Sequence, residues 1–246
     1  MRRASLLTVS LAMVVLGVGG PHDQGVEVPF VGCPADGQVG PIEAPQGKPR
    51  TVALDTRTAG RIAFYKGDVG FGVFAPRGWH CRVWYGSGGE TIIVTPGRID
   101  SGTHRRLGTG QAVELMSALG GTSGRFTVAR YASQLFRSAA AEFIERVKSE
   151  SLVPTADLII ERSSNDSMTY SDILTVTFTT AANKPGLGTQ EDLDPSSDMI
   201  HGIAVLDTSG DWEIHVLDAR LGTSLRQVEA AILKLNKDCM RRSEGC

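Results

Sequence analysis

The sequence has little net charge and no long apolar run beyond its first 20 residues. Its 246 residues carry a formal net charge of −2, with 25 Lys and Arg against 27 Asp and Glu. Because the basic and acidic residues nearly balance, the chain lacks the excess of positive charge that phosphate binding needs. The composition therefore argues against nucleic acid as a partner and against charge-driven attachment to membranes. The composition, 41% hydrophobic and 21% charged, is typical of an ordinary globular protein.

Familiar cofactor and metal motifs are also missing. The chain has no P-loop, no H-E-x-x-H sequence and no complete dinucleotide-binding glycine pattern, so we predict no cofactor. Without a C-x-x-C pair, a four-cysteine zinc site is disfavoured. The acidic segment around Asp192 and Asp194 lacks the glycine of a calcium-binding EF-hand loop, and Ile203 stands where its glutamate belongs. We therefore predict no metal site.

The first 20 residues predict a secretory signal peptide. Arg2 and Arg3 precede the uncharged run LLTVSLAMVVLGV, which is followed by two small residues. A run of about 13 residues is short for a membrane span, so we expect cleavage near Gly19 and no stable membrane insertion afterwards. An uncleaved anchor is the alternative. The protein is predicted to be periplasmic or secreted.

Only four cysteines are present, and export would place them in an oxidising compartment. An even count predicts two disulfides, for which three connectivities exist. Cys239 and Cys246 flank a short polar segment that could close a local loop, which leaves Cys33 to pair with Cys81. This connectivity is a preference among the three.

We expect three regions: the signal peptide (1–20), an extended Pro/Gly-rich arm (21–57) and a single α+β domain (58–246). Short strand-like runs bounded by Gly or Pro, separated by few helices, predict a largely antiparallel sheet packed against about three helices. The helices are expected near residues 111–119, over 130–150 and over 224–237.

The segment from Phe74 to Pro96 comes closest to a catalytic motif, but it reads as a hairpin. Side chains alternate along a strand, so His80 and Cys81 point to opposite faces and do not form a nucleophile and base dyad. Ser87 lies in a Gly-rich turn and lacks the G-x-S-x-G arrangement of a nucleophile elbow. The structural interpretation is preferred.

A second hairpin supplies the weak catalytic candidates. If Ser209 and Gly210 form its turn, strand pairing sets His201 opposite Asp218 and places His215 on the other face. The couple could be a general base with its orienting carboxylate or, as we favour, an ion pair that closes the core.

Arg105 and Arg106 are weak candidates for an anion site. They precede the amino end of the helix expected near residues 111–119, and such ends attract anions. Surface arginines near a turn are the simpler interpretation.

Two segments carry a resemblance to known families. GCPADGQVGP (32–41), followed by FAPRGWHCRVWYGSGG (74–89), resembles a pattern in uncharacterised exported proteins of Gram-negative bacteria. The resemblance covers about the first third of the mature chain and implies no activity or site. The F-x-P-x-G-W run is also similar to the opening strands of PsbP-like α/β/α domains, but it is too short to transfer a function.

Two functions from different classes stay open. The first, which we favour, is a non-enzymatic interaction or ligand-binding module of the cell envelope that binds an unknown protein or small molecule. The second is a hydrolase whose site is assembled from distant residues around His201 and Asp218. An enzyme predicts a deep pocket with perturbed titratable groups, whereas an adaptor predicts an exposed apolar patch.

Overall fold

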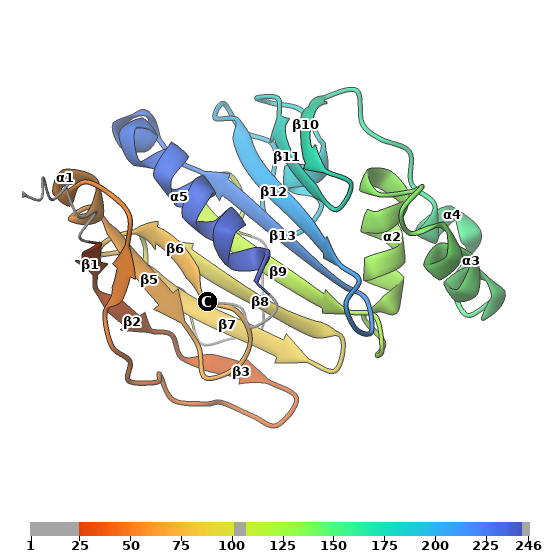
Figure 1. The fold of residues 1–246 in the computed structure, drawn as a ribbon, viewed down its shortest axis with the longest axis horizontal. Helices are drawn as coiled ribbons and strands as arrows, with labels where there is room; N and C mark the ends of the chain where they lie inside the picture. The colour runs from red at the N-terminus through yellow and green to blue at the C-terminus, as the bar shows by residue number, and fades with distance from the viewer. Residues whose placement is uncertain (1–24, 101–106, 243–246) are drawn as a thin grey trace, which may run out of the picture.

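The computed structural model describes residues 25–100 and 107–242, so the expected signal peptide lies outside the described residues. Its largest element is an eight-stranded sheet (Figure 1). In spatial order the strands are β10 (Asp166–Asp172), β11 (Thr175–Thr180), β12 (Ile200–Asp207), β13 (Glu213–Arg220), β9 (Ala112–Leu119), β8 (Gly89–Thr95), β7 (His80–Gly86) and β3 (Ala35–Gly37). All neighbours are antiparallel except β3 and β7. The sheet is therefore mixed but largely antiparallel.

Smaller sheets and helices surround this sheet. A three-stranded sheet consists of β2 (Phe30–Gly32), β5 (Ile62–Lys66) and β6 (Val73–Pro76), while β1 (Val26–Val28) pairs with β4 (Arg50–Val52). The helices in the described residues are α1 (Thr56–Ala59), α2 (Arg125–Leu135), α3 (Ala141–Ser149), α4 (Thr155–Leu158) and α5 (Arg226–Met240), with 3-10 turns η1 (Leu187–Thr189) and η2 (Thr223–Leu225). The arrangement is α+β, and the helix expected over 224–237 is confirmed as α5.

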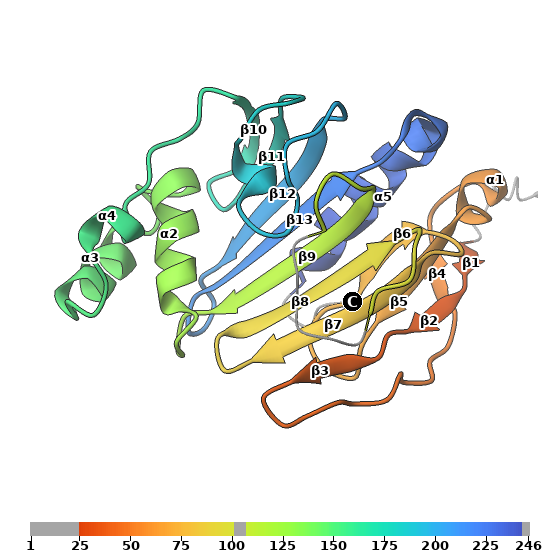
Figure 2. The same ribbon diagram turned by 180° about the vertical axis from the view of Figure 1, so that it is seen from behind.

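The central strands of the large sheet, β12, β13 and β9, are buried on both faces. One face packs against α5 and the three-stranded sheet, which lie in front of it in Figure 1, and its core includes Phe64, Leu115 and Ile232. On the opposite face, seen in Figure 2, a second core around Tyr131 and Val216 packs against α2 and α3. The central strands β9 and β13 contribute to both cores.

The helix expected near residues 111–119 is wrong, because this segment forms β9. Val113 and Leu115 point into the α5-side core, while Met116 and Ala118 point into the α2-side core. A strand buried on both faces is apolar almost without interruption, and such a run cannot be told from a buried helix by its periodicity.

The single helix expected over 130–150 is two helices, α2 and α3, joined by residues 136–140. Side chains bond the last carbonyl groups of α2, which stabilises a helix end at Leu135. Arg137 Nε donates to Ser133 O (3.0 Å), and the Tyr170 hydroxyl donates to Leu135 O (2.8 Å). Tertiary contacts thus override a helical pattern that continues in the sequence.

The amino-terminal arm is extended, as expected, but it is hydrogen-bonded into the sheets. From residue 25 onward it contributes β1 to β4 and the short helix α1. Strand β2 pairs with β5, and β3 adds to the edge of the large sheet beside β7. The arm therefore forms part of the fold as well as covering it.

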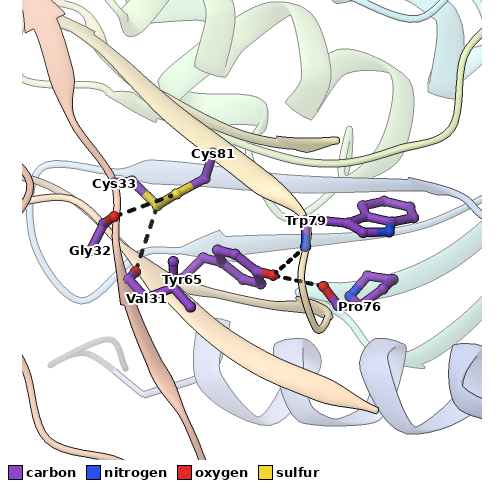
Figure 3. Close-up of a disulfide and its surroundings, with 7 residues drawn as sticks. All are labelled: Val31, Gly32, Cys33, Tyr65, Pro76, Trp79 and Cys81. Carbon is purple, nitrogen blue, oxygen red and sulfur yellow. Dashed lines mark hydrogen bonds between the residues drawn. A yellow bond between two sulfur atoms is a disulfide. The ribbon is translucent and has the colours of Figure 1, made fainter. Parts of the chain in front are cut away.

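A disulfide between Cys33 and Cys81 fixes the arm to β7, which confirms this expected pair (Figure 3). Figure 3 also shows Tyr65, whose hydroxyl donates to Pro76 O (2.7 Å) and accepts from Trp79 N (3.1 Å). Burial raises the pKa of Tyr65 to about 12, so this hydroxyl remains protonated and holds the turn between β6 and β7.

The second expected disulfide is not tested. Cys239 lies in α5 and is buried against the core, whereas Cys246 lies outside the described residues. Their pairing stays a prediction.

Candidate functional site

Strands β12 and β13 pair one residue away from the expected register. Their turn takes up residues 208–212 rather than two residues, so that His201 lies opposite Ala219 and Asp218 lies opposite Gly202. A shift of one residue turns each side chain to the other face of a sheet. His201 and Asp218 therefore lie on opposite faces, and the expected couple does not form.

His201 instead lies beside a hydroxyl-lined groove of about 290 Å³ next to α5. Its Nδ1 is 3.0 Å from Thr179 Oγ1, and its Nε2 is 3.9 Å from Glu229 Oε1. A hydroxyl, an imidazole and a carboxylate are the components of an activated nucleophile. However, 3.9 Å is too long for a hydrogen bond, so Glu229 does not orient the ring as a catalytic carboxylate would.

Asp218 belongs to a buried acidic cluster on the α2 side of the sheet. Its cross-strand partner is Glu114, and the two residues are 2% and 1% exposed. Burial raises the pKa of Glu114 well above its usual value, and the charges of Asp192 and Asp218 raise it further. Burial likewise raises the pKa of Asp218, with Glu191 adding to the effect. In both carboxyl groups burial therefore favours the protonated form.

Residues 187–194 cover this cluster. Glu191 Oε1 accepts from the Tyr131 hydroxyl (2.8 Å) and from Arg130 Nη2 (2.6 Å), so α2 holds the segment in place. At Gly188 a Cβ atom would lie 2.5 Å from the Ile200 side chain, which is too close for any other residue without rearrangement. Among the described residues, no three His, Cys, Asp or Glu side chains are grouped to hold a metal ion.

Ser117 and His215 form a buried pair on the α5 side that the sequence interpretation missed. They are cross-strand partners on β9 and β13, with Ser117 Oγ 3.0 Å from His215 Nδ1. Phe71 covers the imidazole at 4.3 Å between ring centroids, and burial lowers the pKa of His215 to about 4. Because both residues are almost fully buried, the hydroxyl does not meet a substrate in this conformation. No motif marks the pair, since Ser117 falls in the segment expected as a helix.

We expected His215 on the face of the sheet opposite His201. This prediction is wrong, because the shifted pairing of β12 and β13 places both histidines on the same face. His215 lies across from Val205, which shares its face with His201. The two histidines nevertheless stand at different positions along the hairpin and form no common site.

The anion site at Arg105 and Arg106 stays a prediction. Both residues lie outside the described residues. The helix whose amino end was to attract the anion is strand β9.

Ser87 lies in the two-residue turn of the β7–β8 hairpin, because Gly86 and Gly89 are cross-strand partners. Its hydroxyl is 3.1 Å from that of Ser123. The hairpin interpretation of this segment is confirmed.

An apolar cavity lies where α2 ends beside the edge strand β10. Its volume is about 570 Å³, and its apolar lining comes from Leu135, Phe136, Ala139, Tyr170 and Ile173. Ile173, in the β10–β11 turn, is 77% exposed, and Tyr170 is 41% exposed. We refer to this hollow as the α2–β10 cavity.

Two arginines border the α2–β10 cavity. Arg137 forms an ion pair with Glu161 (3.1 Å), but both side chains are more than half exposed, so the pair is weak. The Arg162 guanidinium lies 5.5 Å from the centre of the Tyr170 ring. The cavity thus combines apolar walls with a cationic rim.

A second hollow, of about 520 Å³, lies on the other side of Ile173. It contains the ion pair between Asp172 and Arg241 (3.1 Å) and the polar turn residues 207–209. This lining is more polar than that of the α2–β10 cavity and suits an apolar ligand less well.

No protein-family model matches the chain, and a search of curated proteins finds no match either. In the part of the chain that the structure describes, no helix is both long and apolar enough to cross a membrane. The geometry of the α2–β10 cavity is therefore the main basis for a functional assignment.

Proposed function

We propose that the protein is a non-enzymatic ligand-binding module of the cell envelope, periplasmic or secreted, which binds small apolar molecules in the α2–β10 cavity. The cavity itself supports this proposal. Its volume of about 570 Å³ is that of a small-molecule site, and its lining of aliphatic and aromatic side chains with a few polar groups is typical of such sites.

Export is supported by two features. The amino terminus predicts a signal peptide over residues 1–20. The Cys33–Cys81 disulfide is of a kind that persists in oxidising compartments and is rare in the cytosol.

Binding fits the cavity better than hydrolysis does. Its lining residues include two hydroxyls, those of Ser138 and Tyr170, but no histidine that could activate either of them. The two hydroxyl–histidine pairs described above lie elsewhere: Ser117 with His215 is buried, and His201 lacks a hydrogen-bonded carboxylate. The hydrolase alternative therefore has no assembled and accessible site among these residues.

Filling the cavity is expected to abolish binding of an apolar ligand. Ser138 is exposed on the cavity wall, so Ser138→Trp can place an indole in the hollow without disturbing the core. We expect the wild-type protein to bind the neutral fluorescent probe N-phenyl-1-naphthylamine and Ser138→Trp to raise its Kd at least about tenfold. The measurement is a fluorescence titration.

The matched control is Ser149→Trp, which adds the same indole to an exposed position on α3 away from the cavity. It is expected to leave the Kd within about twofold. Equal binding by the two variants would place the probe elsewhere, and no binding by the wild-type protein would contradict the proposed function.

A further inference from the structure

The arginines of the α2–β10 cavity are held there by the end of α2. Arg162 Nε donates to Gln134 O (2.5 Å), and its Nη2 donates to Leu135 O (3.4 Å). Arg137 Nε donates to Ser133 O. These carbonyls form the negative end of the helix dipole, which attracts cationic groups. Both guanidinium groups are therefore positioned before any ligand arrives.

Arg162 keeps donors that the helix does not use. A guanidinium carries five N–H groups, of which the two contacts to α2 take two. Within residues 25–100 and 107–242, Arg162 forms no ion pair and makes no other hydrogen bond. Three N–H groups remain for a ligand, at the rim of the apolar cavity, where Arg162 is exposed.

The nearby acidic groups leave this charge largely uncompensated. Asp172, the one carboxylate that lines the cavity, accepts from Leu174 N and pairs with Arg241 on the far side of the turn. Glu161 pairs with Arg137. Arg162 thus supplies a free positive charge at the mouth of the cavity.

Resting on the proposed function, we infer that the α2–β10 cavity selects amphipathic anions: a carboxylate joined to an apolar chain or ring. The apolar part contacts Ala139, Tyr170 and Ile173, and the carboxylate accepts from the unused N–H groups of Arg162. Charge-assisted hydrogen bonds of this kind are stronger than neutral ones, and the planar guanidinium matches a carboxylate in geometry.

The test compares decanoate with decanamide, two ligands of equal chain length that differ in charge. Isothermal titration at low salt is expected to show the wild-type protein binding decanoate about tenfold more tightly than decanamide. In Arg162→Gln this preference is expected to fall to about twofold or less, because Gln keeps a donor for α2 but no charge. Arg162→Lys is expected to keep part of the preference.

Arg146→Gln is the matched control, because it removes an arginine from α3 that contacts Phe143 and does not line the cavity. It is expected to keep the full preference. Thermal unfolding of each variant checks that the fold is intact, and N-phenyl-1-naphthylamine binding checks that the cavity is intact.

The outcomes separate this inference from the proposed function. If the wild-type protein binds the probe but binds decanoate and decanamide equally, the anion selectivity is wrong and the binding function stands. The same conclusion holds if Arg146→Gln loses the preference as fully as Arg162→Gln, since the effect is then one of overall charge. If neither ligand nor the probe binds, both proposals fail.

Discussion

Replacing Glu114 with Gln is expected to flatten the pH dependence of folding stability as the pH rises above 4.5. Burial and the neighbouring carboxylates raise the pKa of Glu114 well above 4.5 in the folded protein, whereas the unfolded chain exposes the group to water. The folded state therefore binds one more proton than the unfolded state. Glu114 contributes stability below pH 4.5 that is lost as the pH rises towards its folded-state pKa.

The magnitude follows from proton linkage. While Glu114 is protonated in the folded state and ionised in the unfolded state, the free energy of unfolding falls by about 1.4 kcal/mol per pH unit. Gln resembles a protonated glutamic acid in shape, but it does not titrate. Its substitution is expected to remove this slope, so that the difference in stability between variant and wild type shifts in favour of the variant as the pH rises above 4.5.

His215 titrates in part of the same pH range. Its pKa is lowered from 6.5 to about 4, so it destabilises the folded state as the pH falls through this interval and partly masks the carboxyl effect. Because wild type and Glu114→Gln both carry His215, this contribution cancels in the difference between their free energies of unfolding, measured in urea from pH 4.5 upwards. Glu142→Gln, at an exposed position on α3, is the control and should keep the wild-type slope. Parallel curves for wild type and Glu114→Gln would mean that Glu114 is already ionised in the folded protein.

Removing the Cys33–Cys81 disulfide is expected to cost about 4 kcal/mol of stability. The bond spans a sequence separation of 48 residues, and closing so long a loop restricts the unfolded chain considerably. It also fixes the arm, whose strands β2 and β3 complete two of the sheets. The loss should therefore appear as a lower free energy of unfolding, with early opening of the arm.

The measurement is urea unfolding of the double variant Cys33→Ala/Cys81→Ala beside the wild-type protein. The double variant Cys239→Ala/Cys246→Ala is the comparison, because the pairing predicted there closes a much shorter loop and should stabilise less. A smaller loss for the 33–81 variant than for the 239–246 variant would contradict the loop-length account.

Many of the strands could be predicted from the sequence, because Gly and Pro residues mark where each strand begins and ends. Strands β5 to β8 lie between such residues, and helix α5 has an uninterrupted helical stripe. Strand β10 offered no such signal, since DSMTYSD has little apolar alternation. The register of β12 and β13 depends on a longer turn in which Trp212 adopts a φ of 61° and stacks on Phe143 at 5.0 Å. A tertiary contact of this kind leaves no local pattern in the sequence.

The α2–β10 cavity could not be predicted for a related reason. It exists because α2 stops at Leu135, and α2 stops where Arg162 and Tyr170, distant in sequence, bond its carbonyl groups. The residues that line it come from three separate segments, each unremarkable alone. The expected pairing of His201 with Asp218 depended on a two-residue turn, and a register shift of one residue separates the two side chains.

The most direct test of the binding site is to map it by titrating ¹⁵N-labelled mature protein with decanoate and following the amide chemical shifts. The account predicts saturable shifts concentrated in residues 135–139, Arg162 and residues 170–173, which line the α2–β10 cavity. Shifts centred instead on the His201 groove, or on β7 and β8, would contradict it, as would the absence of saturable change.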